Sequence, residues 1–132
     1  MKGKKVLVDT SIWIEYLGNP SEDLASQMDE YLSEEIVFMP MVVLAELIQG
    51  AKSERELSAI EELFRTIQLL DQQKDTWRHA GVLSYQLKRK EFTVSLTDCY
   101  IAQIALENGC EIFTRDAHFQ LIANVAPLRL VL

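Results

Sequence analysis

Short apolar runs separated by longer stretches of mixed polarity repeat along the chain. The runs of strand type are Val6–Val8, Ile36–Met39, Ile67–Leu70, Glu111–Thr114 and Leu128–Leu132. Each run is short, mostly apolar and without polar alternation, which is typical of a strand buried on both faces of a sheet. Because such strands belong to parallel sheets covered by helices, the pattern predicts a buried sheet rather than an open, half-solvated one.

The stretches between these runs carry apolar residues at helical spacing. They predict helices over Ile12–Leu17, Ser21–Leu32, Met41–Ala51, Ser53–Phe64, Asp71–Lys90, Thr97–Asn108 and His118–Val125. Short strands that alternate with helices imply βα units and one parallel sheet, here of about five short strands. The sequence therefore predicts an α/β fold, with a pair of helices beside the sheet where Met41 to Thr66 has no intervening strand.

Length and composition fit a single domain spanning residues 1–132. Hydrophobic residues make up 48% and charged residues 25%, as in an ordinary globular domain. Apolar runs stay far below the roughly 18–20 residues of a membrane span, so no membrane association is expected. Cys99 and Cys110 form no spaced cluster and are expected in the core of a cytoplasmic protein.

Four carboxylates stand at notable positions. Asp9 follows the first predicted strand, Asp116 follows the fourth, and Asp98 opens an apolar helix. Glu46 is the only charge in the apolar stretch Met41–Gly50. Taken singly, each aspartate is explained equally well as a helix N-cap, and Glu46 as a solvent-facing position.

Taken together, the four carboxylates favour a site. The three aspartates can lie at the carboxyl edge of a parallel sheet, and the helix that carries Glu46 can approach the same edge. Converging carboxylates cannot all stay ionised without a cation. Oxygen ligands without His or Cys select Mg²⁺ or Mn²⁺ over Zn²⁺. Such ions serve phosphoryl chemistry, in which they activate water and offset charge on phosphate.

The carboxylates fall in four motifs that follow one another along the chain. The motifs are Val8–Ile14, Ala45–Gly50, Ser95–Ala102 and Thr114–Phe119. In this order, and over essentially the whole chain, they resemble the PIN domain, specifically the VapC-type toxin ribonucleases of toxin–antitoxin pairs. One departure is Glu91-Phe92, where relatives often have a glycine turn; it concerns a connector and not the site.

The resemblance implies a three-layer α/β/α fold and a Mg²⁺-dependent endoribonuclease, with Mn²⁺ as a substitute ion. It also implies an RNA substrate, a homodimer, and inhibition by a cognate antitoxin whose tail covers the acidic cleft. Water rather than the RNA 2′-hydroxyl would attack the phosphodiester, so 5′-phosphate products are expected.

Carried over by position, the resemblance assigns roles to individual residues. Asp9 and Asp98 would be the principal metal ligands, and Glu46 and Asp116 would complete the catalytic quartet, directly or through water. Candidate supporting hydroxyls belong to Thr10, Ser11 and Thr114.

The net charge of −7 argues, taken alone, against a nucleic-acid binder. Bound cations would change that balance, because the site acids would then face the metal. RNA contacts would come from local cations: Arg115, with Lys52 or the cluster Lys88–Lys90. The cluster fits an ordinary helix C-terminus equally well.

Aromatic and imidazole groups near the motifs are assigned structural roles. Trp13 could stack an RNA base, but an aromatic residue just past a buried strand more often belongs to the core. His79 and His118 are expected to be structural rather than general bases, because a bound metal already activates water.

Two alternative functions stay open. One is another acidic α/β phosphoryl-transfer domain, although phosphatases of that kind need a second Asp where this chain has Ser11, and no glycine-rich phosphate loop is present. The other is a catalytically silent PIN-like binding module, which an assay of metal-dependent RNA cleavage would distinguish.

Overall fold

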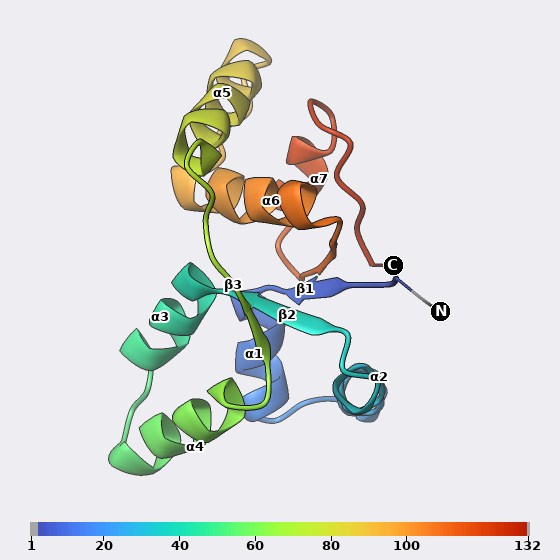
Figure 1. Cartoon of the computed structure of the whole chain (residues 1–132), viewed down its shortest axis with the longest axis vertical. Helices are drawn as coiled ribbons and strands as arrows, with labels where there is room; N and C mark the ends of the chain where they lie inside the picture. Colours follow the sequence, from blue (N-terminus) through green and yellow to red (C-terminus); the bar gives the residue numbers. More distant parts are fainter. Residues whose placement is uncertain (1–2, 132) are drawn as a thin grey trace.

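A computed structural model describes residues 3–131 of the chain (Figure 1). The strands of this part are β1 (Val6–Val8), β2 (Val37–Pro40), β3 (Gln68–Leu70) and β4 (Glu111–Phe113). The helices are α1 (Thr10–Leu17), α2 (Glu22–Ser33), α3 (Met41–Gln49), α4 (Glu54–Phe64), α5 (Thr76–Arg89), α6 (Leu96–Asn108) and α7 (His118–Ile122).

The strands form one parallel sheet in the order β3-β2-β1-β4. β1 lies inside the sheet, with β2 and then β3 on one side of it and β4 on the other side. Val8 of β1 pairs with Phe113 of β4, so the two strands end side by side. Their carboxyl ends flank the point where the strand order reverses, which is where open α/β sheets bind ligands.

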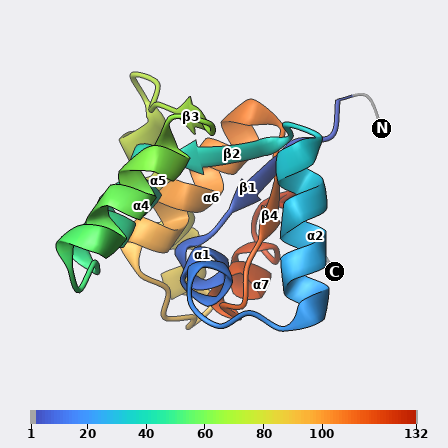
Figure 2. The ribbon, with the colours of Figure 1, turned by 90° about the horizontal axis from the view of Figure 1, so that it is seen from below.

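Helices cover both faces of this sheet. Helices α5, α6 and α7 contact one another on one face, and α1 to α4 lie on the other (Figure 1). Seen from below, α2 and α4 lie at opposite sides of the layer formed by α1 to α4, with α1 between them (Figure 2). The predicted three-layer α/β/α arrangement is confirmed.

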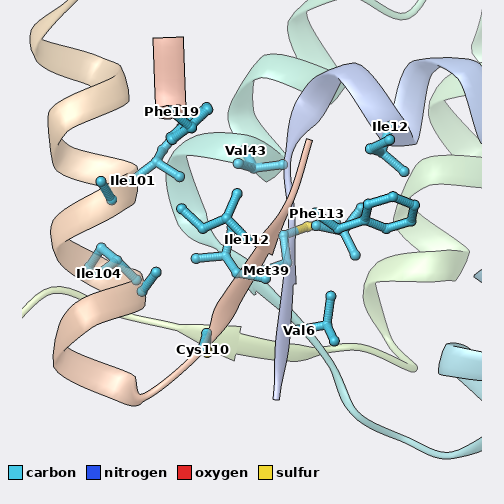
Figure 3. Close-up of a cluster of buried hydrophobic side chains, with 14 of the residues drawn as sticks. Val6, Ile12, Met39, Val43, Ile101, Ile104, Cys110, Ile112, Phe113 and Phe119 are labelled. Carbon is cyan, nitrogen blue, oxygen red and sulfur yellow. The ribbon is translucent and has the colours of Figure 1, made fainter. Parts of the chain in front are cut away.

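The core occupies both sides of the sheet, and neighbouring residues of β4 serve the two sides. Ile112 points toward Ile101 and Ile104 of α6, whereas Phe113 points to the other side (Figure 3). There Phe113 meets Tyr31 of α2 edge to face, with ring centroids 6.0 Å apart. Full burial of each such side chain contributes ~1.5–3 kcal/mol to the stability of the fold, and this packing fixes the strand ends that carry the site.

Serine side chains and a glycine cap several helix ends. Side chains of Ser21, Ser53 and Ser95 accept backbone N–H bonds at the starts of α2, α4 and α6. Gly109 ends α6 in the left-handed conformation, with φ of 67°, which glycine adopts without strain.

The predicted helix Asp71–Lys90 begins later than expected, at Thr76. The Asp71 carboxylate accepts the N–H of Gln72 (2.8 Å), and the Thr76 hydroxyl accepts the N–H of Gln73 (2.8 Å). These local side-chain bonds satisfy the backbone without a helix, so residues 71–75 form a connector.

The predicted strand Leu128–Leu132 is wrong as a strand, and Leu132 lies outside the described residues. A single parallel bridge joins Leu130 to Ile112, so the described sheet has four strands rather than about five. The chain turns at Ala126, whose carbonyl accepts the N–H of Leu128 (2.8 Å), and only a short end reaches the sheet edge. Within residues 3–131, no helix combines the length and apolar character needed to cross a membrane.

Candidate metal and active site

Asp9 stands at the N-cap position of α1, but its side chain makes no capping bond. Its Oδ2 atom instead accepts hydrogen bonds from the hydroxyls of Ser11 (3.0 Å) and Thr114 (2.8 Å). The residue is only 5% exposed. A buried carboxylate is costly unless it is hydrogen-bonded or binds a cation, so these two hydroxyls stabilise it in place.

The same two hydroxyls hold the loop after β4 against Asp9. Thr114 Oγ1 accepts the backbone N–H of Asp116 (2.9 Å), and Ser11 Oγ accepts that of Arg115 (3.0 Å). Each hydroxyl therefore donates to the carboxylate and accepts from the loop. These bonds tie the ends of β1 and β4 together, and the role of Ser11 and Thr114 in supporting a metal ligand stays a prediction.

Glu46 belongs to α3, in the layer of helices formed by α1 to α4. Its Oε1 atom accepts a hydrogen bond from the hydroxyl of Thr10 (2.7 Å), the first residue of α1. The side chain is neither buried nor fully exposed. This bond links Glu46 of α3 to Thr10, the residue that follows Asp9.

Asp98 and Asp116 lie on the far side of the same edge. Asp98 sits in the first turn of α6, where the Ser95 hydroxyl accepts its N–H (3.1 Å). The Oδ1 atom of Asp116 accepts the N–H of His118 (2.9 Å), an Asx-type turn that starts α7. Asp98, Asp116 and His118 each offer one atom that could bind a metal ion, and these three atoms lie within 4.8 Å of one another. Local capping and convergence on a site therefore coexist in these residues.

The electrostatics of Asp98 indicate a place for a cation. Burial raises the pKa of its carboxyl most, and the charge of Asp116 raises it further. The hydrogen bond with Ser95 lowers this pKa, the charge of Asp9 raises it by less, and the nearby His118 imidazole lowers it least. Crowded acids whose ionised forms oppose one another are relieved by a divalent ion. The donor set therefore fits the metal that the acidic motifs imply.

The imidazole of His118 takes a position that the sequence did not predict. Its Nδ1 atom lies 3.3 Å from Asp116 Oδ1 and 3.4 Å from Asp98 Oδ2. The sequence predicts a structural role for His118 on the helix after Asp116. His118 is the first residue of that helix, α7, and only its proximity to the two acids is not predicted. The signal for its true place was the Asp-x-His spacing, because an Asx turn folds the third residue back toward the aspartate.

The other candidate contacts differ in outcome. Trp13 has no exposed surface, so base stacking is excluded and the core interpretation is confirmed. Arg115 forms an ion pair with Glu15 of α1 (3.1 Å), so its charge is partly neutralised beside the site. Lys88 and Arg89 occupy the last turn of α5, as expected of an ordinary helix C-terminus.

An open groove of about 400 Å³ runs between α1, α3 and α4. Its apolar wall includes Ile14 and Leu17, which are 63% and 43% exposed. Glu46, Lys52 and Glu56 supply its charges. The groove therefore reaches from an apolar surface to one of the four acids, and it contains the predicted contact Lys52.

The fold and the site define a class: α/β proteins whose carboxylates gather at the carboxyl edge of a parallel sheet and suit a divalent cation. Residues 6–125 match the family model of the PIN domain, and the chain belongs to that family.

Individual proteins are similar to this chain over nearly its full length. The VapC ribonuclease Mb1587 of Mycobacterium bovis is 30% identical over 128 residues, covering 94% of this chain and 96% of that protein. The DNA-bound VapBC structure from Salmonella typhimurium has a chain 26% identical, with a TM-score of 0.81 and 97% of each chain covered. The VapBC-1 structure from nontypeable Haemophilus influenzae has a chain 25% identical, with a TM-score of 0.77 and 96% of each chain covered.

Proposed function

We propose that the chain is a metal-dependent endoribonuclease that acts as the toxin of a toxin–antitoxin pair. The observation that carries the proposal is the convergence of Asp98 and Asp116 beside the hydroxyl-bound Asp9, at the point where the strand order reverses. Similarity over nearly the full length to VapC ribonucleases supports RNA as the substrate.

The proposed division of labour follows from the contacts. Asp9, Asp98 and Asp116 would hold Mg²⁺ or Mn²⁺, which when bound would activate water and offset charge on the phosphodiester. Ser11 and Thr114 would keep the buried Asp9 carboxylate oriented toward the ion. Such outer hydrogen bonds fix a ligand's direction and tune its basicity.

Glu46 would complete the quartet from the opposite wall. Its hydrogen bond from Thr10 holds one carboxylate oxygen, Oε1. The other oxygen would accept a proton from water that attacks the phosphate. Water attack leaves a 5′-phosphate and a 3′-hydroxyl, whereas attack by the RNA 2′-hydroxyl would leave a 2′,3′-cyclic phosphate.

RNA backbone contacts would come from Arg115 and Lys52, which lie near different acids. Arg115 follows Thr114 directly, and its ion pair with Glu15 is exposed. Exposed pairs are weak, so a phosphate could replace the Glu15 carboxylate at little cost. Lys52 lines the groove that contains Glu46.

The inhibitory partner would be an antitoxin that lies in the groove between α1, α3 and α4. The groove is open, largely apolar at Ile14 and Leu17, and ends at Glu46. An apolar segment seated there would carry its end over the acids. Similar solved chains come from VapBC, a family of toxin–antitoxin systems, which supports a partner of this kind. A homodimer stays a prediction.

The test is cleavage of total cellular RNA by the purified chain, with sequencing of the ends produced. We expect 5′-phosphate ends in Mg²⁺ or Mn²⁺, no cleavage in EDTA, and no cleavage by Asp9→Asn in either ion. Asp23→Asn is a matched control, because Asp23 is an exposed acid in the first turn of α2. Cleavage by Asp9→Asn at the wild-type rate, or cyclic-phosphate ends, would contradict the proposal, and no cleavage under any condition would favour a silent binding module.

A further inference from the structure

His118 directs one ring nitrogen at two carboxylates that come from different elements. Its Nδ1 atom lies 3.3 Å from Asp116 Oδ1, in the loop after β4, and 3.4 Å from Asp98 Oδ2, in α6. The backbone N–H of the same residue is already bonded to Asp116 (2.9 Å). That bond anchors the start of α7, so the ring is held over the gap between the two acids.

These separations suit ligands of a shared ion better than they suit a hydrogen bond. An N–H···O bond usually spans ~2.7–3.2 Å between heavy atoms, and both distances exceed that range. Neighbouring ligands of an ion bound at about 2.1–2.2 Å lie roughly 3.0–3.5 Å apart, depending on the coordination angle. A single ion can therefore touch Nδ1 and both carboxylate oxygens with small movements.

We propose that His118 is a nitrogen ligand of the metal held by Asp98 and Asp116, and that it makes the centre prefer Mn²⁺ over Mg²⁺. This inference rests on the metal site of the proposed function. Mg²⁺ takes oxygen ligands and loses its waters reluctantly, whereas imidazole nitrogen suits first-row transition ions. The surrounding carboxylates keep the site rich in oxygen, which favours Mn²⁺ among those ions.

The expectation of Mg²⁺ depended on the absence of His among the acidic ligands. The fold removes that premise, because it brings His118 to the same three-residue cluster as Asp98 and Asp116. Its side chain is 50% exposed, so the second ring nitrogen can keep a proton toward solvent while Nδ1 binds the ion.

The test measures metal binding directly on the purified full-length chain at one fixed pH. Free Mn²⁺ is counted by its electron paramagnetic resonance signal, and Mg²⁺ affinity is obtained by competition. We expect His118→Asn to weaken Mn²⁺ binding 10–100-fold and to change Mg²⁺ binding less than about threefold. His79→Asn is the control, because His79 lies on α5 and contacts Arg78 (3.3 Å).

A second measurement identifies the ligand atom. Pulsed electron paramagnetic resonance of bound Mn²⁺ should show coupling to a nitrogen that changes when histidine is labelled with ¹⁵N. The coupling should be lost in His118→Asn and kept in His79→Asn. Where a His118 variant does not fold, the coupling in labelled His79→Asn still assigns the nitrogen, because His118 is then the only histidine left in the sequence.

The outcomes separate the inference from the proposed function. Mn²⁺ bound with histidine coupling but without RNA cleavage supports the ligand and contradicts the nuclease. RNA cleavage with bound Mn²⁺ that shows no nitrogen coupling contradicts the ligand and supports the nuclease. Equal losses of Mn²⁺ and Mg²⁺ affinity in His118→Asn would also overturn the inference, because they would leave His118 only a positioning role.

Discussion

Replacing Thr114 by valine tests how the buried carboxylate of Asp9 is held. Valine keeps the size and branching of threonine and removes only the hydroxyl. That hydroxyl donates to Asp9 Oδ2 at 2.8 Å and accepts the N–H of Asp116 at 2.9 Å, so the substitution removes both bonds. The result should be a loss of stability and a displaced metal ligand.

The magnitude follows from the kinds of bond lost. A hydrogen bond to a charged group contributes ~1.5–3 kcal/mol and one between neutral groups ~0.5–1.5 kcal/mol. Ser11 still donates to the same Asp9 oxygen (3.0 Å), which keeps the loss near the lower end. We expect Thr114→Val to lower the free energy of unfolding by about 2–3 kcal/mol and Mn²⁺ affinity by about 10–100-fold.

Urea unfolding followed by circular dichroism in EDTA measures the first quantity, and Mn²⁺ titration measures the second. Thr114→Ser is the matched control, because it keeps the hydroxyl and loses a methyl group. It should lie within ~1 kcal/mol of the wild type. A Thr114→Val protein as stable as the wild type, or a serine variant as unstable as the valine variant, would refute the reasoning.

Three further predictions concern the charges and the groove. Burial, followed by neighbouring carboxylates, raises the pKa of Asp98, so its ionised form opposes folding. This penalty is absent near pH 3 and develops as the pH rises through the raised pKa. In EDTA at pH 7, Asp98→Asn should therefore be more stable than the wild type by ~0.5–2 kcal/mol, and near pH 3 the two proteins should be equally stable. Urea unfolding at both pH values measures these free energies. Arg115→Ala should weaken RNA binding and reduce by about 1 the slope of the logarithm of affinity against the logarithm of salt concentration, whereas Glu15→Gln, which frees Arg115, should tighten RNA binding. Fluorescence anisotropy in a catalytically inactive background measures both affinities. Equal affinities of these variants and the parent protein would exclude Arg115 as an RNA contact. Ile14→Asp, on the open wall of the groove, should prevent co-elution with the proposed antitoxin partner after co-expression and leave RNA cleavage unchanged. A stable complex would exclude the groove as the binding site of that partner.

Local patterns determined the secondary structure and the class of fold. The run Val6–Val8 has no polar alternation, so it is a strand buried on both faces, and Ser95 caps the helix that carries Asp98. Such signals depend on neighbours within a few residues, which is why they can be read in order along the chain. They failed at residues 71–75 and near Leu130, where short-range side-chain bonds and a turn decide the backbone.

The acids of the candidate site were also open to prediction. Each aspartate follows a strand or begins a helix, and parallel strands end at one edge, whereas Glu46 is the only charge in an apolar stretch. The contacts around them were not. Thr114 bonds to Asp9 across 105 positions of sequence, and Arg115 pairs with Glu15 across 100. These pairings depend on the register of β1 against β4, which no local pattern encodes. The packing of α6 against β4 and α7 brings His118 to Asp98, so the sequence supplied the residue types while the tertiary structure decided which of them form the candidate donor set.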